Sequence, residues 1–231
     1  MKNWYKPVVT AVALVLLCAC SGEGEESSAG AARTGADAAE WTRVSHFNTY
    51  TDGYGSVIAI AVVENVLDRP HEAVEVAMIL KAADGAELDR TGGQIALLPP
   101  RSTSPLKVVF NDGDETDWET VEPRVWRARQ PEDTAAYTEL ALEDVADGND
   151  PGSSHVHQAT GTVRNAGESN AQFVTIHAAF FNAEDELVAV AEGGAAGSLA
   201  PGDEADFAVG TNTAADDIAR VQLTPMARKI D

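Results

Sequence analysis

The sequence predicts an all-β protein in which two β-sandwiches follow a signal peptide and a flexible acidic linker. Three observations support this: a short apolar segment ending in cysteine, a run of small and charged residues after it, and an alternating apolar pattern that recurs 100 residues along the chain. The predicted parts are a signal peptide, an anchoring cysteine with its linker, and the two sandwiches. Their expected ranges are 1–19, 20–40, 41–130 and 134–231.

The N-terminal segment has the features of a secretory signal. Lys2 and Lys6 precede an uncharged, mainly apolar run at 7–19, which is short for a bilayer span of roughly twenty residues. The run ends in Leu-Cys-Ala-Cys and resembles the lipobox of bacterial lipoproteins. The resemblance implies cleavage before Cys20 and acylation of that cysteine, palmitate included, at the extracytoplasmic face of the cell membrane. An ordinary signal peptide and a transmembrane anchor are the alternatives.

Residues 21–40 are mostly small, polar or acidic, which is typical of a flexible linker. The whole chain has 37 acidic and 16 basic residues, a formal charge of -21. This charge repels phosphate backbones, so a nucleic-acid partner is not expected. It also repels anionic lipid headgroups, so we expect the lipid to hold the protein at the membrane.

A repeat with an offset of 100 residues defines the two sandwiches. Four alternating apolar positions occur in both copies: Val74, Val76, Met78 and Leu80, and Val174, Ile176, Ala178 and Phe180. Alternation of this kind predicts half-buried antiparallel strands, because successive side chains point to opposite faces. Further strands are predicted at 41–50, 121–129, 137–142 and 218–223. Each copy therefore has six or seven strands, as in a β-sandwich.

The segment 159–209 carries a group of motifs in a fixed order. They are Gly161, Val163 and Asn165, then Phe180, Phe181 and Asn182, then Leu199, Pro201 and Gly202. In this order the segment resembles the FxLYD domain of secreted bacterial and archaeal proteins. The resemblance implies an immunoglobulin-like β-sandwich with an accessory, non-catalytic role, and it implies no ligand. The first copy joins the resemblance through the internal repeat and Asn65.

Catalytic and cofactor motifs give no supported enzyme assignment. The sequence contains no phosphate loop, dinucleotide-binding glycine pattern or nucleophile elbow. Ser104 and Lys107 match a Ser-x-x-Lys pattern, but they lie in a predicted strand. His155 and His157 share a strand face that could bind zinc, yet His177 falls on the other face of a neighbouring strand. We therefore predict no enzyme and no cofactor.

Acidic residues after the last apolar strand of the first copy provide a candidate calcium site. The candidate ligands are Asp112, Asp114 and Asp117. Carboxylates spaced every two or three residues could coordinate calcium, which prefers six to eight oxygen ligands. The alternative is a solvated acidic loop.

One difference between the copies points to an interaction surface. The outward face of an early strand carries Ile58, Ile60 and Val62, whereas the matching face of the second copy carries polar residues such as Thr160. Three exposed aliphatic side chains in a row are unfavourable, so this stripe is expected to be covered. A neighbouring strand or loop, the second sandwich, or another protein could cover it. Our hypothesis is that the stripe makes the first sandwich adhesive.

These observations favour a non-enzymatic, lipid-anchored envelope protein whose tandem sandwiches form a spacer or a protein-interaction module. The expected partners are the membrane, through the lipid, and an unidentified envelope protein. The alternative is an extracytoplasmic lipoprotein that binds a ligand or calcium.

Overall fold

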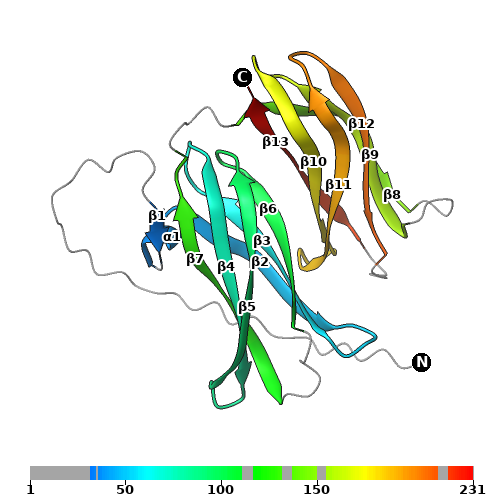
Figure 1. Cartoon of the computed structure of the whole chain (residues 1–231). Coiled ribbons are helices and arrows are strands. Elements are labelled where there is room, and N and C mark those ends of the chain that lie inside the picture. Colours follow the sequence, from blue (N-terminus) through cyan, green and yellow to red (C-terminus); the bar gives the residue numbers. More distant parts are fainter. Residues whose placement is uncertain are drawn as a thin grey trace.

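A computed structural model describes residues 32–34, 36–110, 117–131, 137–149, 155–212 and 218–230. These residues form almost only antiparallel strands, which confirms the predicted all-β class (Figure 1). The first sandwich contains β1 (Ala32–Thr34), the short helix α1 (Ala36–Ala39), β2 (Thr42–Thr51), β3 (Val57–Asn65), β4 (His71–Ala82), β5 (Glu87–Leu98), β6 (Thr103–Phe110) and β7 (Trp118–Arg129). The second contains β8 (Leu140–Gly148), β9 (His157–Asn165), β10 (Asn170–Phe181), β11 (Leu187–Leu199), β12 (Glu204–Thr211) and β13 (Arg220–Ile230).

The two sandwiches have the same topology. In the first, a sheet in the order β1-β7-β4-β5 faces a sheet in the order β2-β3-β6. In the second, the sheets run β11-β10-β13 and β12-β9-β8. Strands β2 to β7 thus correspond in order to β8 to β13, and β3 and β9 are 100 residues apart. The structure therefore confirms the internal repeat.

Each sandwich has its own apolar core, built from the alternating positions of its strands. Val74, Val76, Met78 and Leu80 lie in the first core, and Val174, Ile176, Ala178 and Phe180 lie in the second. All eight side chains are at most 1% exposed. The alternation places these residues inside because β4 and β10 each turn one face toward the opposite sheet.

Two buried asparagines explain the motif that the copies share. The Nδ2 group of Asn165 donates to the carbonyls of Ser169 at 2.8 Å and Leu199 at 3.0 Å. Asn65 makes matching bonds to the carbonyls of Arg69 and Pro99, both at 2.8 Å. Each side chain therefore joins the turn that follows it to the turn after β5 or after β11, and its polar atoms are satisfied in the core.

Residues assigned to the linker from the sequence belong in part to the first sandwich, which corrects the predicted linker of 20–40. Strand β1 pairs with the edge of β7, from Ala32 opposite Arg129 to Thr34 opposite Arg127. Helix α1 follows, and its Ala38 is fully buried in the first core. Main-chain pairing, as in β1, does not require apolar side chains. A small alanine can also fill a tightly packed position, as Ala38 does. The composition of this segment therefore did not reveal that it forms part of the first sandwich.

The four sheets lie in one stack. The first core separates the β4 sheet from the β3 sheet, and the second core separates the β10 sheet from the β9 sheet. A third apolar cluster joins residues of β3 to residues of β10 and β11. The β3 and β10 sheets are consequently the inner layers of the molecule, and the β4 and β9 sheets are its outer layers (Figure 1).

Candidate functional site

The predicted interaction stripe lies at the contact between the two sandwiches, which we call the junction. Ile58, Ile60 and Val62 are at most 3% exposed. They pack in one cluster with three residues of the second sandwich, Ala179, Phe181 and Leu187. The sequence left open whether a neighbouring strand or loop, the second sandwich or another protein covers this stripe. In the structure the second sandwich covers it. Strand β3 is therefore buried on both faces, which explains its unbroken apolar run.

Polar contacts surround one end of the junction. Asp185, in the turn between β10 and β11, accepts a hydrogen bond from Arg220 and lies 3.4 Å from Nε2 of His46 of the first sandwich. The contact with Arg220 lowers the pKa of Asp185 below its usual value. The ring of His46 also packs edge-on against Phe181, with centroids 4.9 Å apart. This end of the junction is therefore held by the aromatic packing of His46 on Phe181 and by the polar contact between His46 and Asp185.

The other end of the junction contains a serine, a histidine and a glutamate. Ser104 Oγ of β6 lies 3.2 Å from Nδ1 of His177 of β10. His177 Nε2 lies 3.9 Å from a carboxylate oxygen of Glu192 of β11. Burial lowers the pKa of His177, and the carboxylate of Glu192 opposes this effect in part. The neutral imidazole is thus favoured at the hydrogen bond that links the two sandwiches.

This group does not have the geometry of a nucleophilic triad. Ser104 is fully buried, so its hydroxyl is not presented to a substrate. It lies in β6 directly before Pro105 and not on a turn that projects it outward. Contact with Nδ1 of His177 instead satisfies a buried hydroxyl at the junction. The arrangement therefore suits the joining of two domains.

A groove of about 490 Å³ runs along this end of the junction, between β5 and β6 of the first sandwich and β10 and β13 of the second. Met226 of β13 enters from the second sandwich and belongs to the core of the first. Phe173, at the rim, is 70% exposed and has a φ of 54°. Ala73, the equivalent residue of the first copy, has a φ of 49°. The left-handed bulge is therefore a feature of the repeat, whereas the exposed ring is specific to the second copy.

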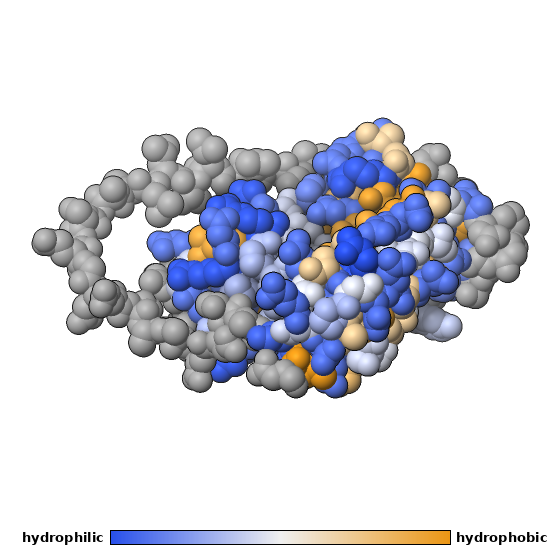
Figure 2. Space-filling model, turned by 90° about the horizontal axis from the view of Figure 1, so that it is seen from above, coloured by the Kyte–Doolittle hydropathy of each residue, from blue (hydrophilic) through white to orange (hydrophobic). Residues whose placement is uncertain are grey.

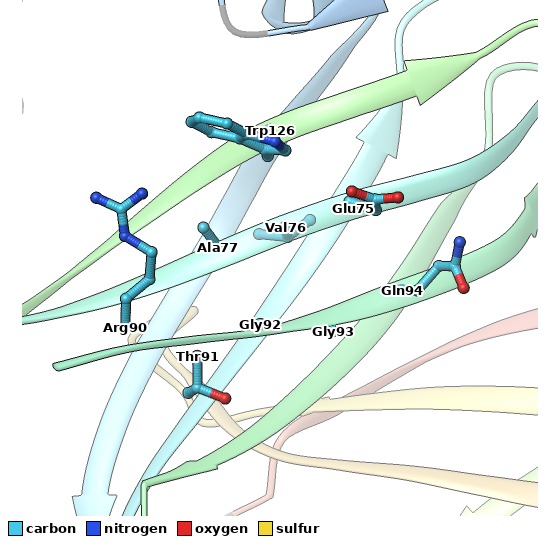
Figure 3. A pocket seen from close by; sticks show the side chains of 9 residues that line it. All are labelled: Glu75, Val76, Ala77, Arg90, Thr91, Gly92, Gly93, Gln94 and Trp126. Atoms are coloured by element: carbon cyan, nitrogen blue, oxygen red, sulfur yellow. The ribbon is translucent and has the colours of Figure 1, made fainter. Parts of the chain in front are cut away.

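A second groove lies on the outer face of the β4 sheet, and we call it the Trp126 groove. It meets the groove at the junction at Gln94, which lines both. Its volume is about 510 Å³. Trp126 of β7 is 46% exposed and stands at one side, and Arg90 of β5 stands opposite (Figure 3). Ala77 and Gly92 form the floor between them. Glu75 and Gln94 complete the lining toward the other end.

The remainder of the surface offers few apolar groups. Figure 2 shows hydrophilic residues over most of the face in view, with hydrophobic residues in small, separate groups. The half-exposed indole of Trp126 and the more exposed rings of Phe173 and Tyr54 are the large aromatic groups at the surface of the described residues. These three aromatic groups are therefore the places on the described surface where an apolar contact with a ligand or partner is easiest to form.

The other site residues predicted from the sequence are not brought together. Cys20, Asp112 and Asp114 lie outside the described residues, and Asp117 is exposed at the start of the chain that leads into β7. Among the residues that the structure describes, no three His, Cys, Asp or Glu side chains form a group suited to a metal ion. His157 lies 3.1 Å from the side-chain oxygen of Asn149 and packs on Phe180, whereas His177 lies at the junction.

Sequence reasoning did not identify Trp126, Met226 or the pairing of Ser104 with His177. Trp126 and Met226 are 100 positions apart, so the repeat relates them. Strand alternation alone did not use that relation. The pairing of Ser104 with His177 joins two sandwiches whose mutual placement the alternation does not encode.

Comparison with known proteins adds no identification. No family model and no curated protein sequence matches this chain. Across the described ranges, the structure has no helix that is long and apolar enough to cross a membrane.

Proposed function

We propose that this protein is a non-enzymatic, lipid-anchored component of a bacterial cell envelope whose two sandwiches act together as a spacer or a protein-interaction module. The FxLYD-like motifs and the lipobox-like Leu-Cys-Ala-Cys support this proposal from the sequence. The junction supports it from the structure.

The observation that carries the proposal is the apolar junction. Two domains joined only by a linker move freely by default, unless their interface is large and apolar. Here five large side chains, all at most 3% exposed, meet between the sandwiches: Ile58, Ile60, Val62, Phe181 and Leu187. Hydrogen bonds across the junction add orientation, among them Asn48 Nδ2 to the Leu187 carbonyl at 2.8 Å. Two sandwiches fixed to each other in this way keep a constant distance between the ends of the molecule, as a spacer requires.

The strand pairing of β1 brings the proposed anchor near the first sandwich. Cys20 precedes Ala32, the first residue of β1, by twelve positions. Twelve residues reach at most about 40 Å when fully extended. The proposed lipid would therefore hold the edge of the first sandwich at β1 within about 40 Å of the membrane, with the second sandwich stacked on the opposite side of the β3 sheet.

The anchor is tested by two cysteine variants expressed in a bacterial host and labelled with a palmitate analogue. We expect Cys20→Ser to abolish the label and to release the protein from the membrane fraction, because the acylated thiol is lost. Cys18→Ser is the matched control and should keep both the label and the membrane location. A label that persists in Cys20→Ser, or that disappears in Cys18→Ser, would contradict the assignment.

The alternative of calcium binding stays a prediction, since two of its three candidate ligands lie outside the described residues. Thermal unfolding with calcium and with a chelator distinguishes the two functions. An increase of several degrees with calcium, lost in Asp114→Asn, would favour an ion-binding lipoprotein. An unchanged melting temperature would leave the spacer or interaction module.

A further inference from the structure

The Trp126 groove and the groove at the junction occupy the same place in the two copies of the repeat. Four pairs of lining residues are each separated by 100 positions: Glu75 and Thr175, Ala77 and His177, Gly92 and Glu192, and Trp126 and Met226. In the second sandwich the first sandwich covers part of this face, and Met226 is 8% exposed. In the first sandwich the face is open and Trp126 is 46% exposed.

The open face does not reproduce the apolar surface that joins the sandwiches. In the second copy that surface is Ala179, Phe181 and Leu187, and the residues 100 positions earlier are Ile79, Lys81 and Glu87. Lys81 pairs with Glu122, and Glu87 pairs with Arg90 at 2.8 Å. A sheet docked there as at the junction would bury these ion pairs, and taking paired charges out of water is unfavourable. A second sandwich docked as at the junction is therefore not what we expect in the Trp126 groove.

The chemistry of the lining indicates the kind of ligand that the groove suits. The indole stands at one side of a floor of one methyl group and one bare glycine, Ala77 and Gly92 (Figure 3). Gly92 is exposed and cannot fill the hollow with a side chain. Around the floor stand an amide, a carboxylate and a guanidinium group, from Gln94, Glu75 and Arg90. The site thus offers one stacking surface and several planar hydrogen-bonding groups in an open, wet groove.

We propose that the Trp126 groove binds a pyranose unit of a polysaccharide. A pyranose has an apolar C–H face that packs on an aromatic ring and a rim of hydroxyl groups that pair with amide, carboxylate and guanidinium groups. Its neutral, hydroxyl-rich surface leaves the surrounding ion pairs hydrated. A long glycan enters because the groove is open along the sheet. The choice of a cell-wall glycan as one source rests on the proposed envelope location, whereas the sugar chemistry rests on the groove alone.

The test uses the full chain, purified in a detergent whose headgroup is not a sugar, and measures co-sedimentation with two insoluble polysaccharides. One is bacterial peptidoglycan sacculi and the other is cellulose, so the two arms separate a cell-wall source from a general glucan. We expect the parent to bind at least one of them. Trp126→Ala should weaken that binding about tenfold or more, because the stacking surface is lost. Gln94→Ala should weaken it about threefold to tenfold.

Two variants are matched controls, because each removes an exposed aromatic ring elsewhere. Tyr54 is 94% exposed in the β2–β3 turn, and Phe173 lies at the other groove. Tyr54→Ala and Phe173→Ala should bind within twofold of the parent. Ala77→Leu fills the floor while keeping the indole, and should weaken binding as Trp126→Ala does. Thermal unfolding of each variant checks that it folds.

Three results would overturn the proposal. The first is a parent that binds neither polysaccharide. The second is a folded Trp126→Ala variant that binds as well as the parent. The third is a concentration-dependent dimer in sedimentation velocity that Trp126→Ala abolishes, which would make the groove a contact between protein chains. None of these results depends on Cys20, so failure of the sugar site and failure of the anchor are separate outcomes.

Discussion

Replacement of Ile60 tests whether the two sandwiches unfold as one unit. Ile60 is 1% exposed and lies in the middle of the junction stripe, facing the second sandwich. Ile60→Ala removes three carbon atoms, which corresponds to about 2.4 kcal/mol at ~0.8 kcal/mol for each buried CH₂. The remaining cavity adds to this, so we expect a loss of about 3 kcal/mol in the free energy of unfolding.

Ile60→Glu is the stronger perturbation, because it places a carboxylate in the apolar cluster. Burying an unpaired charge is far more costly than leaving it in water, so we expect the sandwiches to separate while each keeps its own core. Calorimetry should show one cooperative transition for the parent, since Met226 of the second sandwich completes the core of the first. The Ile60→Glu variant should show two transitions and a larger hydrodynamic radius.

Thr160 provides the matched control for both variants. It is the residue 100 positions after Ile60, on the corresponding face of β9, and it is exposed. Thr160→Ala and Thr160→Glu should change the free energy of unfolding by less than about 0.5 kcal/mol. The reasoning is refuted if Ile60→Glu unfolds with the stability, the single transition and the hydrodynamic radius of the parent.

Two further predictions concern buried polar groups. His71 is fully buried and stacks on Trp41, and burial lowers its pKa from 6.5 to about 4. As the pH decreases, the unfolded chain therefore protonates His71 at a higher pH than the folded protein does. The free energy of unfolding should fall by about 3 kcal/mol between pH 6.5 and pH 4. Urea unfolding across this range should show a weaker pH dependence in His71→Gln, and an equal dependence would contradict the assignment. Asn165→Ala leaves the Leu199 carbonyl and the Gly167 amide without their partner, so we expect a loss of about 3 kcal/mol by the same method. A loss below about 1 kcal/mol would show that these bonds are replaced by water.

Strand positions and core residues followed from the sequence because each alternating side chain reports its own environment. Val174 and Ile176 alternate with Thr175 and His177, and this pattern requires one buried face whatever the rest of the fold does. The pattern also showed that Ile58 and Ile60 need a cover. It did not choose the cover, since a strand, a second domain and a separate protein all bury an aliphatic side chain equally well.

Order near the N-terminus could not be predicted for a related reason. The pairing of β1 with β7 uses backbone groups, which every residue except proline supplies in the same form. Residues 32–34, Ala-Arg-Thr, therefore carry no side-chain signal for the strand that they form.

The sequence by itself determined which face of each strand is buried, because alternation depends on residues a few positions apart, and its 100-residue repeat determined that the chain has two copies of one β-sandwich. Only the tertiary structure decided that the β3 sheet docks on the β10 sheet, that Ser104 meets His177, and that Trp126 remains open where Met226 is covered. The two copies have nearly the same fold, so their different surfaces, and not their strands, set which faces meet. That choice is made by side chains more than 70 residues apart, whose contact exists only after both sandwiches have formed.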